Sequence, residues 1–337
     1  MTVKIKTTQK RASSIAGILP QVAVGLLLSI LNASCTDTPR DSIFNPGGPA
    51  AARIAELGWE MIWIFTGYFL VTLLLLALAL RGRKREKSPI GFRFVFVLGI
   101  ALPTLILVKI LISTLQLTLD LGSGKSELQI EITSHHWWFE VRYPGYPIID
   151  ANEIHIPVGK MIRFKLLSKA VVHSFWVPRL TGKRDMLPDH PTELRMTAGE
   201  PGIYHGTCTE YCAGPHALMA FKLIAHEPAE FEKWLRTRAE VPAVPVDPVV
   251  LKGRTVFEKA CANCHAIRGL SEARVGPDLT YMGSRTTIGA GTVPNTKGNM
   301  AGWIANPQKI KPRNLMPRSY LPPEDLHSLL EYLESLK

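Results

Sequence analysis

The segment Cys208-Thr209-Glu210-Tyr211-Cys212-Ala213-Gly214-Pro215-His216-Ala217-Leu218-Met219 places two thiols, an imidazole and a thioether within 12 residues. These are soft ligands, and soft sulfur selects copper or zinc over magnesium or calcium. A mononuclear blue-copper site needs one cysteine, whereas two cysteines that are four residues apart could bridge two copper ions. The segment therefore predicts a metal centre, for which dinuclear copper is the preferred interpretation.

A second imidazole for this centre is available upstream. His173, in Val172-His173-Ser174-Phe175-Trp176-Val177-Pro178, begins a predicted strand 35 residues before Cys208. A disulfide between Cys208 and Cys212, or a structural zinc site, would fit the cysteine pair taken alone. Neither alternative accounts for Met219 and the His173 segment, so both are less favoured than copper.

A second redox motif, Cys261-Ala262-Asn263-Cys264-His265, has the spacing by which c-type haem is attached. The two thiols would form thioether links to the porphyrin, and the adjacent imidazole would reach the iron. A zinc or redox Cys-x-x-Cys site is the alternative.

A methionine is the expected second axial ligand, because it raises the potential of the haem. Met316 lies in Asn314-Leu315-Met316-Pro317, and a loop methionine followed by proline is rigidly presented. The rival candidates, which resemble packing residues, are Met282 and Met300.

Hydrophobic patterning around these motifs predicts an all-β region followed by a helical one. Alternation with a period of two, typical of strands in an antiparallel sandwich or barrel, covers 128–132, 153–156 and 161–166. A closing helical turn is predicted over 231–238, and the proline-rich stretch 241–248 indicates a stiff, extended linker. Helices are then predicted over 249–261, 300–306 and 323–336.

Two long apolar segments precede the strands. Residues 59–80 are long enough to cross a hydrocarbon core of about 30 Å, and a second such segment extends from 94 to about 119. The strongly basic stretch 81–87 between them favours a cytoplasmic loop, which places everything after Leu119 outside the cytoplasm. Lys109 interrupts the second segment and is expected to snorkel to the outer interface.

Residues 1–35 are predicted to be a secretory signal peptide, because basic residues precede an apolar stretch from 15 to 31. Small residues before Cys35 resemble a lipoprotein cleavage site, although Asn32 stands where an aliphatic residue is usual. Ordinary cleavage nearby and an uncleaved apolar helix are the alternatives.

Composition excludes several classes of protein. The chain has 337 residues, of which 46% are hydrophobic and 20% are charged. This content excludes a disordered chain, and the length allows for two domains. The net charge of +11 would suit nucleic acid, a membrane surface or an acidic partner. The clustering of basic residues at 81–87 is better explained as a topology signal, so no nucleic-acid partner is expected.

Taken together, these features resemble subunit II of haem–copper cytochrome c oxidase, in the caa-type form with a cytochrome c domain fused to its C-terminus. The resemblance covers nearly all of residues 50–337 and includes Trp137-Trp138 and Gly276-Pro277-Asp278-Leu279. It implies a multidomain fold with an N-terminal transmembrane helical hairpin (50–120), an all-β cupredoxin barrel (124–236), a linker (237–247) and an all-α class I cytochrome c domain (248–337).

The resemblance also implies a set of cofactors. A dinuclear copper centre, CuA, would be held by His173, Cys208, Glu210 through its backbone carbonyl, Cys212, His216 and Met219. The Glu210 side chain would bind a magnesium or manganese ion shared with subunit I. Covalent haem c would be held by Cys261, Cys264, His265 and Met316. Trp137 matches the residue that passes electrons to copper, and a packed or membrane-interface aromatic is its alternative reading.

The implied function is that of the subunit through which electrons enter a terminal respiratory oxidase. The implied partners are oxidase subunits I and III and cytochrome c or another donor. The implied location is the bacterial plasma membrane, as a multi-pass protein with both redox domains on the periplasmic side. The chain has no candidate oxygen-reducing site, so the oxygen-reducing, proton-translocating activity would belong to the complex. The alternatives are a membrane-tethered haem and copper carrier outside any oxidase, and a nitrogen-oxide reductase, for which too few unassigned ligands remain.

Overall fold

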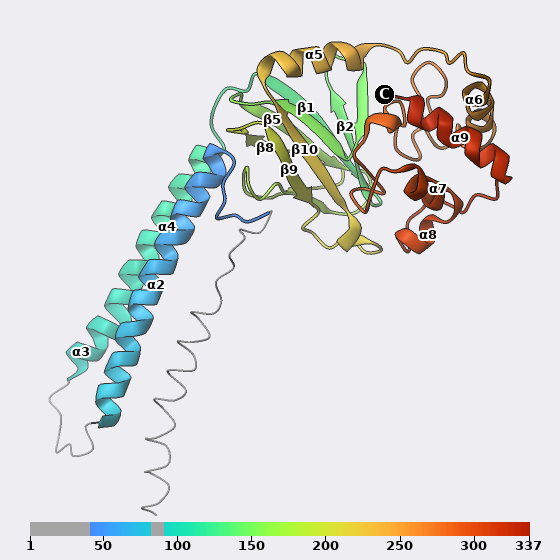
Figure 1. Ribbon diagram of the computed structural model, residues 1–337. Coiled ribbons are helices and arrows are strands. Elements are labelled where there is room, and N and C mark those ends of the chain that lie inside the picture. Colours follow the sequence, from blue (N-terminus) through green and yellow to red (C-terminus); the bar gives the residue numbers. More distant parts are fainter. Residues whose placement is uncertain (1–40, 82–90) are drawn as a thin grey trace, which may run out of the picture. The chain divides into compact units, whose positions relative to one another are not determined.

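The computed structural model describes residues 41–81 and 91–337 (Figure 1). The signal peptide predicted over 1–35, with Cys35, lies outside the described residues, as does most of the basic stretch 81–87. The described part contains a pair of long helices, a β-rich region and a helical region, in that order along the chain.

The long helices are apolar along most of their length. The first is α2 (Pro49–Arg81), and the second consists of α3 (Phe92–Phe96), the π-helical turn η1 (Val97–Ala101) and α4 (Leu102–Leu121). Both are long and apolar enough to cross a membrane, and the chain buries almost none of their surface. The apolar segments predicted over 59–80 and 94–119 lie within these helices.

Two ion pairs join α2 to α4. Arg53 Nη2 lies 2.8 Å from Asp120 Oδ2, and Lys109 Nζ contacts a carboxylate oxygen of Glu60. The sequence predicted that Lys109 would snorkel to the outer interface, and this stays a prediction. The structure adds a partner, Glu60, because the neighbouring helix brings a carboxylate within reach of the lysine side chain.

The β-rich region contains two main sheets. The first has the strand order β3-β2-β1-β5-β8, and the second has the order β4-β10-β9. Their bounds are β1 (Leu128–His135), β2 (Trp138–Tyr143), β3 (Ile148–Ala151), β4 (Glu153–Pro157), β5 (Ile162–Ser168), β8 (Thr192–Met196), β9 (Gly202–Thr207) and β10 (Ala220–His226). A separate pair is formed by β6 (His173–Phe175) and β7 (Arg184–Met186). Buried and partly exposed residues alternate along β5 and β10, as the period-two pattern predicts.

Two strand pairs are parallel, which corrects the prediction of a purely antiparallel arrangement. β1 pairs in parallel with β5, and β4 pairs in parallel with β10. The reason is topological. The chain leaves the first sheet after β3, contributes β4 to the second sheet, and returns to the first sheet as β5. A hairpin turn would have made the two paired strands antiparallel, whereas this crossover brings β5 back parallel to β1.

Aromatic side chains fill the core of the β-rich region. Phe139, Phe175 and Phe221 have ring centroids 4.4–6.1 Å apart, and all three are buried. Helix α5 (Pro228–Ala239) buries Phe231 and Leu235 against the same core. This packing supports the strand ends from which the candidate ligands project.

Residues 240–247 have almost no regular structure, and α5 extends three residues into the predicted linker. The helical region follows, with α6 (Pro248–Ala260), α7 (Lys297–Ala305), α8 (Pro307–Ile310) and α9 (Pro323–Ser335). The Asp247 side chain accepts hydrogen bonds from Val249 N and Val250 N, which explains where α6 begins.

Helices α6 and α9 pack closely. A Cβ on Gly253 would lie 1.9 Å from the Ser328 carbonyl oxygen, so only glycine permits this approach. The second core, which includes Phe257, Leu329 and Tyr332, lies around this contact. The helices predicted over 249–261, 300–306 and 323–336 are therefore present, with ends shifted by at most three residues.

Candidate copper and haem centres

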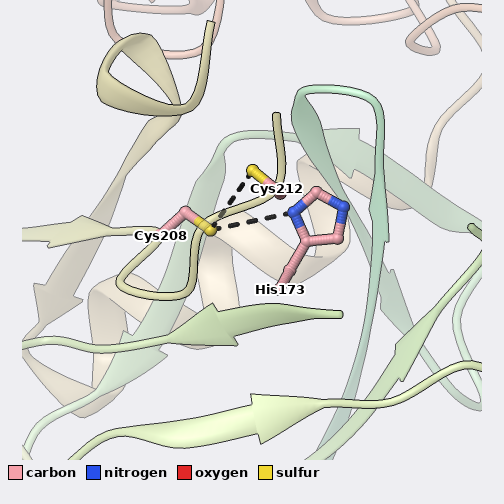
Figure 2. Close-up of side chains that lie close together, drawn as sticks. All are labelled: His173, Cys208 and Cys212. Atoms are coloured by element: carbon pink, nitrogen blue, oxygen red, sulfur yellow. Dashed lines mark hydrogen bonds between the residues drawn. The ribbon is translucent and has the colours of Figure 1, made fainter. Parts of the chain in front are cut away.

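The first candidate centre lies where β9 ends and β6 begins. Cys208 follows β9 directly, Cys212 lies four residues further along the same loop, and His173 is the first residue of β6. The Cys208 sulfur is 3.7 Å from His173 Nδ1 and 3.9 Å from the Cys212 sulfur (Figure 2). The structure thus brings His173 to the cysteine pair.

The donor geometry fits a metal better than a disulfide. The ligand atoms of His173, Cys208 and Cys212 all lie within 4.8 Å of one another, and all three residues are buried. The two sulfurs are 3.9 Å apart, whereas a disulfide bond is about 2.05 Å long. The His173 Nε2 atom is buried without a hydrogen-bond partner among the described residues. Its other ring nitrogen, Nδ1, is directed at the Cys208 sulfur.

Two other predicted ligand atoms lie against this cluster, and Met219 is joined to it through its backbone. His216 Nδ1 lies 3.4 Å from the Cys212 sulfur, and the Glu210 carbonyl oxygen lies 3.3 Å from the Cys208 sulfur. Met219 is fully buried, and its carbonyl oxygen accepts a hydrogen bond from Cys208 N at 3.0 Å. That hydrogen bond closes the loop on itself, so the candidate ligands are held before any metal binds.

The two thiols influence each other's ionisation. A hydrogen bond from Cys212 lowers the pKa of Cys208 to about 3, whereas the same contact raises the pKa of Cys212. Since the thiolate is the form that binds metal, the cluster already stabilises one metal-binding sulfur.

Trp137 packs directly on the candidate copper loop. Its Nε1 donates a hydrogen bond of 2.8 Å to the Cys212 carbonyl oxygen. A Cβ on Gly214 would lie 2.1 Å from the Trp137 ring, and Gly214 has a φ of +42°. Glycine is therefore required at this point for the indole to contact the loop.

The second candidate centre lies at the end of α6. His265 N and Cys264 N both donate to the Cys261 carbonyl oxygen at 3.0 Å, which forms a tight turn. His265 Nδ1 donates to the Pro277 carbonyl oxygen at 2.7 Å, and this fixes the ring with Nε2 left to bind iron. Burial lowers the pKa of His265, which favours the neutral imidazole that coordinates a metal.

Met316 is held in a loop between α8 and α9. Its backbone N donates to Asn314 Oδ1 at 2.8 Å, and its carbonyl oxygen accepts from Gln308 Nε2 at 3.2 Å. Met282 and Met300 are both buried in the second core. Val275 and Leu315 are exposed apolar side chains. Val275 precedes Gly276, which lies against His265, and Leu315 precedes Met316. Both fit the presence of a large apolar group there.

Three further residues were missed in the sequence. Asp150 and Arg285 form a buried ion pair, and Lys311 is buried beside Trp137. Each contact joins residues that are more than 130 positions apart, and no local pattern marks them.

Comparison with known proteins agrees with this arrangement. Residues 145–225 match the family model of the cytochrome c oxidase subunit II periplasmic domain, and residues 250–337 match the cytochrome c family model. The chain therefore combines a domain of the cytochrome c oxidase subunit II family with a cytochrome c domain. The chain is 38% identical over 215 residues to cytochrome c oxidase subunit 2 of Alkalihalophilus pseudofirmus, and 32% identical over 222 residues to that of Bacillus sp. (strain PS3).

The alignments cover 62–63% of this chain and 62% of each of these two subunit 2 relatives. Among solved structures, the periplasmic domain of subunit II (CoxB) of Bradyrhizobium japonicum is 27% identical, with 34% of this chain and 95% of that chain covered and a TM-score of 0.33.

The domain matches and the structure together settle three coarser points. The expected fold class, with two apolar helices, a cupredoxin-like domain and a helical cytochrome c domain, is confirmed. The two matched domains imply copper and haem. The apolar helices and the periplasmic-domain match indicate a membrane-anchored protein with an extracytoplasmic domain. The individual ligands, the domain limits and the role of Trp137 stay predictions.

Proposed function

We propose that this chain is the subunit through which electrons enter a terminal respiratory oxidase. Electrons would pass from a donor via haem c and CuA to the oxygen-reducing subunit I. The observation that carries this proposal is the cluster of His173, Cys208 and Cys212 on the same chain as the Cys261-to-His265 haem motif.

Six residues would hold the dinuclear copper centre: His173, Cys208, Glu210 through its carbonyl, Cys212, His216 and Met219. When bound, this centre supplies a one-electron carrier whose charge is spread over two metals. The chain contributes rigidity, because the loop is closed by the Cys208 N to Met219 O hydrogen bond and rests on the buried strands. Small ligand movement on reduction favours fast transfer.

The haem would be attached through Cys261 and Cys264, with His265 and Met316 as axial ligands. The His265 ring is held by its hydrogen bond to the Pro277 carbonyl oxygen, and the Met316 backbone is held by its hydrogen bond to Asn314 Oδ1. A thioether ligand raises the potential, which suits a carrier that receives electrons from a soluble or membrane-bound donor.

The Glu210 side chain would bind a magnesium or manganese ion shared with subunit I. It is partly buried and forms no hydrogen bond or ion pair with other described residues. Its backbone carbonyl lies against the Cys208 sulfur at the same time. One residue could therefore connect the copper loop with an ion at the boundary of a partner subunit.

The proposed topology is a multi-pass protein of the bacterial plasma membrane, with both redox domains on the periplasmic side. The proposed units are a hairpin over 50–120, a CuA domain over 124–236, a linker over 237–247 and a cytochrome c domain over 248–337. The proposed partners are oxidase subunits I and III, with cytochrome c or another donor.

Purification of the tagged chain from its native membranes tests this proposal. A large integral subunit with an oxidase haem spectrum should copurify with it. Isolation of the chain by itself, with haem c and copper but without such a subunit, would favour the alternative of a membrane-tethered carrier.

A further inference from the structure

Lys311 is a buried lysine that connects the cytochrome c domain with the cupredoxin domain. It follows α8, is 3% exposed, and donates from Nζ to the Trp137 carbonyl oxygen at 2.8 Å and to the Gly289 carbonyl oxygen at 2.9 Å. Trp137 lies in the cupredoxin domain, 174 positions earlier in the chain.

On the cupredoxin side, this contact continues to the candidate copper loop. The Trp137 carbonyl oxygen accepts the hydrogen bond from Lys311, and the indole Nε1 of the same residue donates to the Cys212 carbonyl oxygen at 2.8 Å. One tryptophan therefore joins Lys311 to a predicted copper ligand.

On the haem side, the contact continues to the Met316 loop. Asn314 Nδ2 donates to the Lys311 carbonyl oxygen at 2.6 Å, and Asn314 Oδ1 accepts from Met316 N at 2.8 Å. A succession of hydrogen bonds thus runs from the loop of a predicted haem ligand, through Lys311 and Trp137, to the loop of a predicted copper ligand.

The burial of Lys311 is costly and is not balanced by a carboxylate among the described residues. It forms no ion pair among the described residues, and burial lowers its pKa to about 7. Two carbonyl oxygens are its only hydrogen-bond acceptors within the described part of the chain. Burial of a lysine without a carboxylate partner is unfavourable for stability, so stability alone does not explain Lys311 at this position.

A second contact brings the same region of the cytochrome c domain to the other end of the copper loop. Ala220 N donates to the Ala290 carbonyl oxygen at 3.0 Å, directly after Met219. Gly289, whose carbonyl oxygen also accepts a hydrogen bond from Lys311, immediately precedes Ala290. Lys311 therefore lies in an interface that contacts the copper loop on both sides.

We propose that Lys311 is a positioning residue that fixes Trp137 between the candidate copper loop and the Met316 loop, and so sets the electronic coupling between the two centres. The inference rests on the proposed function. The step it serves is a one-electron transfer, in which the ferrous haem is oxidised to ferric and the copper pair is reduced by one electron. Lys311 itself gains and loses neither an electron nor a proton in this step.

The test compares Lys311→Met with Lys309→Met in the full chain that carries copper and haem. Lys309 lies two residues earlier and is exposed, so it is a matched control. We expect Lys311→Met to slow internal electron transfer on the order of 10- to 100-fold, because a displacement of about 1 Å can cost about 100-fold in rate. Lys309→Met should keep the wild-type rate. Both variants should keep the optical and electron-resonance spectra of the two centres.

Hydrogen–deuterium exchange of the full chain gives a readout that does not depend on the cofactors. Lys311→Met should speed exchange in the peptides that cover 136–139 and 289–292, and Lys309→Met should not. A wild-type transfer rate or wild-type exchange in Lys311→Met would overturn the proposal. If the unmodified chain shows no internal transfer, the proposed function fails, and the exchange comparison still decides whether Lys311 positions Trp137.

Discussion

Arg285 Nη2 lies 2.6 Å from Asp150 Oδ1, and the two side chains are 6% and 2% exposed. Asp150 belongs to β3 of the cupredoxin domain, whereas Arg285 follows η3 (Met282–Ser284) of the cytochrome c domain. Arg285 also donates to the Asp278 carbonyl oxygen. The cytochrome c domain is therefore bound to the cupredoxin domain by a buried ion pair as well as by the linker.

Asp150→Asn should destabilise this interface. Removal of one partner leaves the Arg285 charge buried and unpaired, which costs about 3–5 kcal/mol. Denaturant unfolding of the purified chain measures this loss. Glu127→Gln is the control, because Glu127 pairs with Lys160 at 3.1 Å on the surface and should change stability by about 1 kcal/mol or less. An equally small effect of Asp150→Asn would contradict a buried, stabilising pair.

Glu153 makes stability depend on pH. Burial raises the pKa of Glu153. Its Oε1 accepts a hydrogen bond from Thr286 N. The charged groups that act on this carboxyl are Asp150, Arg238 and Arg285. A carboxyl with a raised folded-state pKa stabilises the fold fully below its unfolded pKa of about 4.3, and this contribution is lost as pH rises through the folded value.

Glu153→Gln should abolish this loss of stability at higher pH, because the amide oxygen can still accept a hydrogen bond from Thr286 and no buried charge forms. The stability of the variant relative to wild type should therefore increase as pH rises from about 4.3 through the folded-state pKa of Glu153. Thermal unfolding midpoints at pH 4.5 and pH 8 measure this difference. A difference between variant and wild type that is constant with pH would show that Glu153 does not titrate with a raised pKa.

Gly276→Ala should disturb the haem centre. A Cβ at this position would lie 2.6 Å from His265 Cε1, so the imidazole or the backbone must move. Such overpacking costs about 1–3 kcal/mol, and we expect less haem bound per chain and a shifted potential. Gly298→Ala is the control, since its Cβ would meet no atom within 4 Å. Full haem content and an unchanged potential in Gly276→Ala would mean that close packing on His265 is unimportant.

Met316→Ala should leave the haem attached through Cys261 and Cys264 while removing its sulfur ligand. The potential should fall, and the sulfur-to-iron absorption band should disappear. Met300→Leu, which changes a buried methionine of the second core, should keep both. Retention of the band in Met316→Ala would transfer the ligand role to Met282 or Met300.

The ligand segments could be identified from the sequence because each is local. The thiols, His216 and Met219 fall within one loop, and Cys261, Cys264 and His265 fall within one turn. His173 was found because the pattern placed it at the start of a strand. The parallel pairing of β1 with β5 was not predicted, since the alternation of side chains is the same in parallel and antiparallel strands.

The interface between the two redox domains could not be predicted for a similar reason. Lys311 and Arg285 are ordinary basic residues in the sequence, and their partners lie 174 and 135 positions away. Only the folded arrangement of both domains brings these charges into buried positions. The tether predicted from the proline-rich stretch 241–248 is therefore supplemented by direct contacts.

The dinuclear copper site is tested most directly by metal analysis and electron resonance of the full chain, with Cys212→Ser as the matched variant. We predict two copper ions per chain in a mixed-valence, delocalised state, and loss of the delocalised signal in Cys212→Ser. One copper ion per chain with a mononuclear hyperfine pattern would contradict the bridging role of Cys208 and Cys212.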